Sequence, residues 1–442
     1  MPYIPVTDSQ RDAMFRVVGI TSIEELFKEI PEDLRFPDLD LEAGLSELEV
    51  MRELSALADA NTHADRVRWF LGGGAYDHVI PAAVGALASI PEFVTAYTPY
   101  QSEVSQGTLQ SIFEYQSMIA ELTGMEVVNA GHYDGATALA EGVLMALKNS
   151  EGRNRVILPA GIHPEYRAVL DTYLAAYNPV IETYTGTPAT AAKAVSGTDL
   201  ACLVAGYPDF FGLVPDLTGA AEGVHEKGGL FIVHADPIML GLFKSPGEWG
   251  ADIVTAEGQS LGNDLNYGGP FLGIMAVTNA LMRRIPGRIV GEARDHEERR
   301  GYVLTLAARE QHIRREKAVS NICSNQGLAM LRACIYLTLM GKQGLRKTAE
   351  LCWHKSHYAA GRIAALPGFS VANGTFFKEF LVTLPKNAES IAEKLYHKNL
   401  VPGLPLSRYF PDRKNELLVC VTETNSRKDI DELVAALGEV CK

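Results

Sequence analysis

A short polar stretch at residues 255–262, TAEGQSLG, continues the apolar run GADIVTA and precedes the glycine-rich segment NYGGPFLG. Chains with an alternating α/β pattern often carry a cofactor-holding lysine at such a turn, because a primary amine forms a Schiff base with an aldehyde. No lysine occurs between Lys244 and Lys317. The stretch therefore raises the question of what a protein does with a pocket for such a cofactor when the lysine is absent.

A second candidate site is the turn in NAGHYDGATALAEGVLMALKN, which precedes a strongly helix-forming run. The turn contains Asn129, Gly131, Asp134, Gly135 and Thr137. The first N–H groups of a helix have no partner within the helix, so such a turn can hold a phosphate. A tight turn before a capped helix accounts for the same residues, and these residues alone favour that simpler interpretation.

Two further polar residues follow apolar runs typical of buried strands. Asp236 ends the run LFIVHAD, where a carboxylate could hold a pyridinium nitrogen by a charge-assisted hydrogen bond. It could equally cap the following PIMLGLF turn, and the sequence leaves both roles open. His163, in AGIHPEY, could stack on a ring, although a loop histidine with a local hydrogen bond is the commoner case.

Three consecutive glycines, Gly72 to Gly74 in LGGGAY, indicate a close approach of the backbone to another group. The motif lacks the preceding strand and the G-x-G-x-x-G spacing of a dinucleotide fold, so we exclude NAD as its ligand. The surrounding segment mixes glycine, proline and aromatic residues in long loops, which are usually binding loops or interfaces.

A basic run, REQHIRREKAVSNICSNQ, brings Arg309, Arg314, Arg315 and Lys317 close together. A solvated helix face is the usual reason for such a run, and a patch for an acidic carrier protein is the sharper interpretation. Cys323 in the same run has no adjacent histidine to activate it, which favours a buried thiol over a nucleophile.

The pattern of apolar runs predicts the scaffold that must position these residues. Runs that are apolar on both faces alternate with helical stretches such as HPEYRAVLDTYLAAY, which predicts a mostly parallel sheet covered by helices. The runs are RVILPA, PVIETY, ACLVAGYP, LFIVHAD, DIVTAEG and FLGIMAV. Ligands of such sheets lie at the carboxyl ends of the strands. After the apolar helix NICSNQGLAMLRACIYLTLMG, the segments GFSVANG, FKEFLVTLP and ELLVCVTET and the helix DIDELVAALGEV predict an α+β unit.

These patterns divide the chain into an N-terminal helical extension (1–65), a large α/β domain (66–330) and a small α+β domain (331–442). In the extension, Ser22 and Glu25 predict a capping box that opens the helix SIEELFKEI, and LSELEVMRELSALADA has apolar residues at helical spacing. A segment this short buries little by itself, so we expect it to wrap over the main domain or a partner.

Composition excludes several classes of protein. The net charge of -14 argues against a nucleic-acid or anionic-membrane surface, since both need clustered Lys and Arg. The N-terminal residues do not form a signal peptide, and no apolar run reaches the roughly 18 residues that span a bilayer, which favours a cytoplasmic protein. The six cysteines form no C-x-x-C pair, so reduced, mostly buried thiols are expected in place of disulfides or a metal site.

Five phrases together carry a resemblance to a known family: FLGGGAYDHVIPAAV, TAYTPYQSEVSQGTLQSIFEYQSMIAELTGMEV, YDGATALAEG, RRGYVLTLAAREQHIRREKAVSNICSNQ and LLVCVTET. The chain closely resembles the glycine decarboxylase component of the glycine cleavage system, specifically the first of the two subunits into which many prokaryotes split it. The resemblance runs from the N-terminal YIP to the last helix. The long TPYQSEVSQGTLQ block is far too specific to arise by chance.

The resemblance implies a pyridoxal-phosphate-dependent transferase fold of the aspartate aminotransferase type (fold type I), with a large seven-stranded domain and a small C-terminal one. In the family's catalytic subunit, a His-Lys pair holds the cofactor as a Schiff base. Alignment of GADIVTAEGQS with that pattern places Gln259 and Ser260 at these two positions. Neither an amide nor a hydroxyl can form a Schiff base, and Lys244 comes too soon after Asp236 to replace the lysine. The chain therefore resembles the non-aldimine subunit.

By the same resemblance, Asp236 stands at the pyridinium position and His163 at the ring-stacking position. Asp134, Gly135 and Thr137 stand at the phosphate position. These residues would form a degenerate pocket, with pyridoxal phosphate held by the partner subunit and none bound covalently to this chain.

The resemblance also implies partners. They are a second glycine decarboxylase subunit that carries the lysine, in a dimer of heterodimers, and the lipoylated H protein, which receives the aminomethyl group after glycine is decarboxylated. We expect Gly73, Tyr76, Tyr97, Tyr100 and Gln101 to lie at the interface or along the substrate tunnel. Two other classes stay open: a self-sufficient pyridoxal phosphate enzyme that uses another lysine, and a structural or regulatory scaffold.

Overall fold

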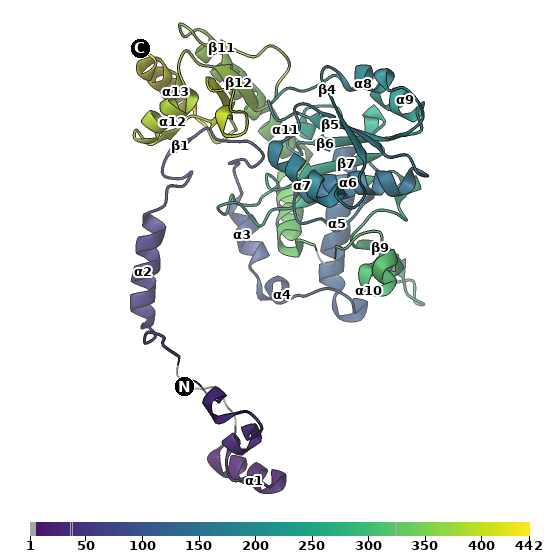
Figure 1. The fold of residues 1–442 in the computed structure, drawn as a ribbon, viewed down its shortest axis with the longest axis vertical. Helices are drawn as coiled ribbons and strands as arrows, with labels where there is room; N and C mark the ends of the chain where they lie inside the picture. The colour runs from purple at the N-terminus through teal and green to yellow at the C-terminus, as the bar shows by residue number, and fades with distance from the viewer. Residues whose placement is uncertain (1–5, 36, 38, 323–324) are drawn as a thin grey trace. The chain divides into compact units, whose positions relative to one another are not determined.

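The structure is a computed structural model that describes residues 6–35, 37, 39–322 and 325–442. The chain forms two compact units, Met1–Thr62 and His63–Lys442, and Figure 1 shows the helices and strands of each. The boundary predicted near residue 330 falls inside the first part of α11 (Gly327–Ala364), which is kinked at Gly341, so the division of the second unit into a large and a small domain stays a prediction. Cys323 lies outside the described residues.

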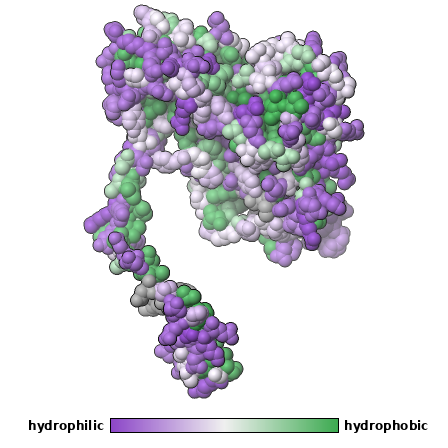
Figure 2. Space-filling view, in the orientation of Figure 1, coloured by the Kyte–Doolittle hydropathy of each residue, from purple (hydrophilic) through white to green (hydrophobic). Residues whose placement is uncertain are grey.

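The first unit consists of short helices whose apolar side chains face outward. α1 (Asp8–Val18) and α2 (Glu47–Asp59) each begin with a capping box, and neither contains a buried residue. Figure 2 shows hydrophobic surface along this unit, to which Val17, Leu54 and Leu57 contribute. A unit that exposes this much apolar surface is not stabilised by a core of its own.

One expected helix start in this unit is wrong. The segment that follows Ser22 is the 3-10 helix η1 (Ile23–Phe27), and the Ser22 side chain makes no capping hydrogen bond. Glu25 instead accepts a hydrogen bond from the Thr21 N–H at 2.8 Å. Glu25 therefore bonds to the residue four positions before it, whereas a capping box joins residues three positions apart. No α-helix follows this contact. A second 3-10 helix, η2 (Glu32–Leu34), comes before α2.

A seven-stranded sheet forms the centre of the second unit (Figure 1). Four strand pairs are parallel, and β8 and β2 add an antiparallel edge. All six predicted strands are present, whereas β2, of only two residues, was not predicted. The strand order is β2 (Val127–Val128), β8 (Gly273–Val277), β7 (Ile253–Glu257), β6 (Leu230–Ala235), β5 (Leu200–Tyr207), β3 (Arg155–Pro159) and β4 (Val180–Tyr184).

Helices cover both faces of this sheet, as its apolar strands require. Alternate residues of β5 show the two layers, since Cys202 and Val204 belong to one hydrophobic core and Leu203 and Ala205 to the other. The first core includes α6 (Gly135–Asn149) and α7 (Pro164–Leu174). The second includes α5 (Gln106–Thr123), α8 (Pro188–Ala194), α9 (Ala220–His225) and the first half of α11. The fold is thus a three-layer α/β/α sandwich.

A smaller antiparallel sheet follows α11. Its strand order is β11 (Ser370–Val371), β12 (Glu379–Thr383), β15 (Glu416–Cys420) and β14 (Leu404–Pro405). α12 (Ala388–Tyr396) and α13 (Arg427–Val440) pack on it. The predicted α+β pattern is therefore present, with α12 and β14 as additions that the sequence patterns did not indicate.

The remaining elements connect and flank these sheets. β1 (Arg68–Trp69) pairs with β13 (Leu400–Val401), and β9 (Ile289–Arg294) forms a hairpin with β10 (Arg300–Thr305). α3 (Ala82–Ala88), α4 (Pro91–Val94) and α10 (Gln311–Arg314) are short helices. Within the described part of the chain, none of the helices has the length and apolar character needed to cross a membrane.

Candidate functional site

A small cavity lies where β3, β5, β6 and β7 end at their carboxyl edge. Residues that follow or end these strands line it, among them His163, Asp209, Asp236 and Glu257. The cavity volume is about 80 Å³, whereas pockets for small organic ligands usually hold roughly 300–1,000 Å³. Its position is that of a ligand site in an open α/β sheet, but its size suits only a few water molecules.

The turn after β7 places Ser260 and Gln259 in the interior. Ser260 is 3% exposed, and its Oγ has no hydrogen-bond partner among the residues that the structure describes. The Gln259 amide pairs with the backbone of Tyr76: its Oε1 accepts from the Tyr76 N–H at 2.8 Å, and its Nε2 donates to the Tyr76 carbonyl at 3.0 Å. Nε2 also donates to the Asn263 carbonyl at 2.8 Å. Gln259 is thereby committed to fixing a loop.

Asp236, directly after β6, uses its two oxygens differently. Oδ1 accepts hydrogen bonds from the N–H groups of Ile238 at 2.9 Å and Met239 at 3.2 Å, so it caps the following turn. Oδ2 forms an ion pair with Lys378 Nζ at 2.7 Å. The two roles that the sequence left open are thus combined in one side chain, except that the cation it faces is an ammonium of the same chain.

Lys378 lies just before β12, and its side chain is only 1% exposed. Its Nζ is 3.0 Å from His78 Nε2 and 3.4 Å from the centre of the Tyr76 ring. Burial lowers the pKa of this lysine, but the charge and hydrogen bonding of Asp236 together with the neighbouring Cys420 and Cys352 outweigh that effect, so the pKa lies above its ordinary value. Lys378 therefore stays a cation, which is the form that pairs with a carboxylate.

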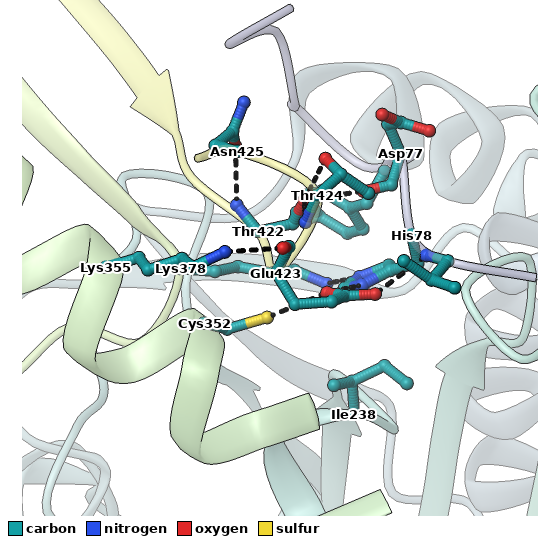
Figure 3. Close-up of polar contacts among 12 residues, drawn as sticks. Asp77, His78, Ile238, Cys352, Lys355, Lys378, Thr422, Glu423, Thr424 and Asn425 are labelled. Carbon is teal, nitrogen blue, oxygen red and sulfur yellow. Dashed lines mark hydrogen bonds and ion pairs between the residues drawn. The ribbon is translucent and has the colours of Figure 1, made fainter. Parts of the chain in front are cut away.

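A buried polar network continues from Lys378 through His78 to Glu423 (Figure 3). An ammonium can only donate, so His78 Nε2 accepts from Lys378, and Nδ1–H then donates to Glu423 Oε2 at 2.8 Å. The same oxygen accepts a hydrogen bond from the Cys352 thiol at 3.3 Å, and Lys355 donates to the Glu423 backbone carbonyl at 2.6 Å.

His78, Cys352 and Glu423 bring their donor atoms within 4.8 Å of one another, which is close enough to surround a metal ion. Burial and the neighbouring Glu423 carboxylate raise the pKa of the Cys352 thiol well above its usual value, whereas a metal requires the thiolate. A cation there would also face the Lys378 ammonium. We therefore assign this cluster to hydrogen bonding.

The turn that precedes α6 holds two carboxylates at the start of the helix. The Thr137 N–H donates to Asp134 Oδ1 at 2.8 Å, which completes a capping box. The Gly135 N–H donates to Glu257 Oε2, also at 2.8 Å. The other oxygen of Glu257 accepts from the N–H groups of Gln259 at 2.9 Å and Leu272 at 3.1 Å. Burial raises the pKa of Glu257 to about 8, although these backbone donors oppose the shift.

His163 caps α7 and faces another aromatic ring. Its Nδ1 accepts from the Glu165 N–H at 3.1 Å, and its Nε2 lies 2.7 Å from the Gly73 carbonyl, to which it donates. The imidazole stacks on Tyr166 with a centroid distance of 4.7 Å and an interplanar angle of 24°. Burial lowers the pKa of His163, so the ring favours the neutral form.

The glycine loop, which we define as residues 72–78, closes over these groups. Gly73 and Gly74 have φ angles of 82° and 113°, which only glycine adopts readily. A Cβ at Gly74 would lie 3.0 Å from His163 Nε2. Glu379 accepts from the Gly73 N–H and from the Tyr76 hydroxyl, each at 2.7 Å. The close approach expected from the glycines is therefore an approach to side chains of the same chain.

A second loop, the tyrosine loop (residues 97–101), lies on the surface. Tyr97 is 92% exposed and Tyr100 is 55% exposed, and Gln101 is also exposed. Tyr100 lies edge-on to His312, and the Arg288 guanidinium is 5.6 Å from its ring centre. The five residues expected at an interface thus fall into two groups. Gly73 and Tyr76 form hydrogen bonds within the chain, whereas the three residues of the tyrosine loop are exposed.

The basic run is also divided. Arg309 is half-buried and donates to the backbone carbonyls of Ile285 and Gly287. Arg314, Arg315 and Lys317 are exposed. Lys244, on the loop before β7, is exposed as well, with its Nζ 3.8 Å from the centre of the Trp249 ring.

Three residues that line the cavity were missed from the sequence, namely Tyr166, Glu257 and Glu379, and so was Lys378, which pairs with Asp236. Glu257 stands in the stretch TAEGQSLG itself, and a carboxylate at the end of a buried strand was a usable signal. Lys378 and Glu379 start the segment KEFLVT, far along the chain from Asp236. A lysine before a strand looks like a solvated residue until the tertiary contact is known.

Pyridoxal phosphate does not fit this set of residues. Position 260 has no amine for a Schiff base. The helix start that would hold the phosphate faces two carboxylates, and the carboxylate that would face the pyridinium already has a cation.

Comparisons with known proteins agree on a single family. The family model described as "Glycine cleavage system P-protein" matches residues 1–437. A relative in Desulforamulus reducens, named probable glycine dehydrogenase (decarboxylating) subunit 1, is 49% identical, with 100% of each chain covered. A relative with the same name in Thermomicrobium roseum is 48% identical, with 99% of each chain covered.

Solved structures place the fold in the same group. A glycine decarboxylase (P-protein) of the glycine cleavage system, crystallised in inhibitor-bound form, superposes with a TM-score of 0.90 at 43% identity and full coverage of both chains. A sphingosine-1-phosphate lyase from Burkholderia pseudomallei superposes with a TM-score of 0.66 at 15% identity, covering 93% of this chain and 94% of that one. The second likeness supports the fold alone, which is that of the fold type I pyridoxal phosphate enzymes.

Proposed function

Since this chain belongs to the glycine cleavage system P-protein family, we propose that it is the subunit of a two-chain glycine decarboxylase that forms no aldimine. The observation that carries this proposal is Ser260, a buried hydroxyl at the position where the family's catalytic subunit has its lysine. A hydroxyl cannot take part in transaldimination, so the chain cannot start the reaction in its own pocket.

The partner subunit would supply the lysine and hold pyridoxal phosphate. Together the two chains would decarboxylate glycine and pass the aminomethyl group to the lipoyl arm of the H protein in the cytoplasm. In this assembly the chain would shape the interface, and the exposed Tyr97, Tyr100 and Gln101 support an outward-facing role for the tyrosine loop. The exposed Arg314, Arg315 and Lys317 offer positive charge for an acidic carrier.

The proposal is tested by purifying the chain with and without its second subunit. Each preparation is reduced with borohydride, digested and searched by mass spectrometry for pyridoxyl-lysine, and glycine–bicarbonate exchange is assayed in the presence of H protein. We expect the adduct only on the second subunit and exchange only in the complex. A stoichiometric adduct on any lysine of this chain would contradict the proposal and favour a self-sufficient enzyme.

A further inference from the structure

We propose that this chain fills its own cofactor pocket with two of its side chains. The Lys378 ammonium takes the place of the pyridinium nitrogen, and the Glu257 carboxyl group takes the place of the phosphate as the hydrogen-bond acceptor at the helix start. Removal of these two side chains then reopens the pocket to a phosphorylated pyridine, whatever residue stands at position 260. This inference deepens the proposed function and rests on it only for the identity of the cofactor.

The Asp236–Lys378 ion pair lies at the end of the pocket where a pyridinium nitrogen would bind. A pyridine nitrogen that pairs with an aspartate presents one positively charged N–H to one carboxylate oxygen. The Lys378 ammonium carries the same charge and lies 2.7 Å from Oδ2 in an ion pair, on a side chain that is itself 1% exposed. Because Oδ1 is used to cap the next turn, Oδ2 is the oxygen left for a cation, and Lys378 occupies it.

The first N–H group of α6 lies at the end of the pocket where a phosphate would bind. A helix start offers unpaired N–H groups and a partial positive charge to an anion. Here the Gly135 N–H donates to Glu257 Oε2, so the acceptor is supplied from the end of β7. An incoming phosphate would have to displace that carboxyl group and would also face the Asp134 cap, which approaches the same turn.

Aromatic rings border the space between the two ends. The Tyr166 ring stacks on His163 and lies edge-on to His234, with centroid distances of 4.7 Å and 5.1 Å. A Cβ on Gly135 would lie 2.8 Å from the Tyr166 hydroxyl, so this ring forms one wall of the cavity up to the helix start. The cavity of about 80 Å³ that remains beside Glu257 and the Asp236–Lys378 pair is too small for a substituted pyridine.

The test uses 4′-deoxypyridoxine 5′-phosphate, a cofactor analogue without the aldehyde, so that binding requires no amine. Its affinity for the full chain is measured by calorimetry, and its effect on the melting temperature by a thermal scan. The variants are Glu257→Ser, Lys378→Met and the double variant, each with Ser260 retained. Glu141→Ser and Lys355→Met are matched controls, since each alters a hydrogen-bonded group of the same type that lies away from the cavity.

We expect the unaltered chain and both controls to show no binding at millimolar analogue. The single variants should bind weakly, and the double variant should bind at least about tenfold more tightly than either, since each restored contact involves a charged group. The analogue should also return the melting temperature of the double variant toward that of the unaltered chain, because it replaces the lost cation and the lost hydrogen-bond acceptor together.

Three results would overturn the inference: binding by the unaltered chain as tight as by the double variant, equal binding by the controls, or no binding by a folded double variant. If the double variant fails to fold, it is refolded from urea with and without the analogue. Recovery that depends on the analogue supports the inference, and recovery that is indifferent to it refutes it. None of these outcomes depends on glycine exchange or on an adduct, so they leave the proposed function to its own test.

Discussion

The glycine loop and the tyrosine loop were both expected at a subunit interface, and they differ in what holds them. Each contains at least one tyrosine. The glycine loop is bonded to Gln259, Glu379 and Glu423 of its own chain. The tyrosine loop exposes 92% of Tyr97, and Tyr100 contacts His312 and Arg288 through its ring. Conformational entropy lost by a loop must be offset by contacts, and the glycine loop makes more of them within the chain.

This comparison separates residues that are bonded within the chain from residues that remain available to a partner. Most of the polar groups around the cavity are paired. They bond to one another, and the network extends from Asp236 to Cys352. Substitutions there should therefore affect folding first, whereas substitutions in the tyrosine loop should affect assembly first.

The largest effect is expected for Lys378→Met. The substitution leaves the Asp236 carboxylate buried without its cation, and breaking a buried ion pair typically costs about 3–5 kcal/mol. The free energy of unfolding, measured by urea titration of the full chain, should fall by that amount. Lys355→Met, which removes one hydrogen bond to a carbonyl, should cost about 1–2 kcal/mol. Addition of Asp236→Asn to Lys378→Met should recover part of the loss, and equal losses in both lysine variants would contradict this assignment.

A pH-dependent effect is expected for Glu423. Burial opposes its ionisation, but the adjacent His78 ring, which donates a hydrogen bond, and the Val79 N–H lower the pKa of Glu423 to about 2. An acid whose pKa is lower in the folded state stabilises the fold above its unfolded pKa of about 4.5 and loses that contribution as the pH falls toward 2. A shift of this size corresponds to about 3 kcal/mol.

Glu423→Gln should therefore flatten the decline in unfolding free energy between pH 4.5 and pH 2, while it lowers stability at pH 7. The matched variant is Glu226→Gln, at an exposed glutamate, where the acid slope should stay as in the unaltered chain. An unchanged slope in Glu423→Gln would show that the network does not depend on this carboxylate.

A smaller loss is expected for Gln259→Leu. The leucine removes both hydrogen bonds to the Tyr76 backbone and leaves a buried N–H and carbonyl unpaired, which costs about 1–3 kcal/mol. Hydrogen exchange should show faster exchange of the Tyr76 amide and its neighbours in the glycine loop. Gln110→Leu, which alters an exposed glutamine on α5, is the control. Unchanged protection of Tyr76 would mean that Glu379 and Glu423 suffice to hold the loop.

The sequence predicted the large sheet well because its strands are continuous apolar runs. β5 and β6 are buried on both faces, and short runs of this kind, bounded by turn residues, are typical of strands in a covered parallel sheet. β2 was missed because two residues carry no periodicity. The capping box at Ser22 failed because the same residue types can bond locally without an α-helix, as the Thr21 to Glu25 contact shows.

The site was harder to predict because its central contacts join distant segments. Resemblance located Asp236, His163 and Ser260, and the glycines indicated a close approach. Nothing in the local pattern indicated that Lys378 would reach Asp236 across 142 positions (378 minus 236) of the sequence. Side-chain pairing of this kind depends on the tertiary fold. The sequence pattern therefore showed that position 260 has no amine, but not that Lys378 pairs with Asp236.

The smallest effect on stability is expected for Tyr97→Ser, and there the comparison is sharpest. An exposed tyrosine contributes little to folding, so the unfolding free energy should change by no more than about 0.5 kcal/mol. If the tyrosine loop faces the second subunit, the same substitution removes a large aromatic contact from the interface, where tyrosines often contribute most of the binding energy. The affinity between the subunits should then fall about tenfold or more, and glycine–bicarbonate exchange should fall at limiting subunit concentration.

The control is Tyr177→Ser, which alters another exposed tyrosine after α7 and should leave both quantities unchanged. If Tyr97→Ser and Tyr177→Ser behave alike in assembly and exchange, the tyrosine loop is ordinary surface, and the contrast with the glycine loop reduces to a difference in internal bonding.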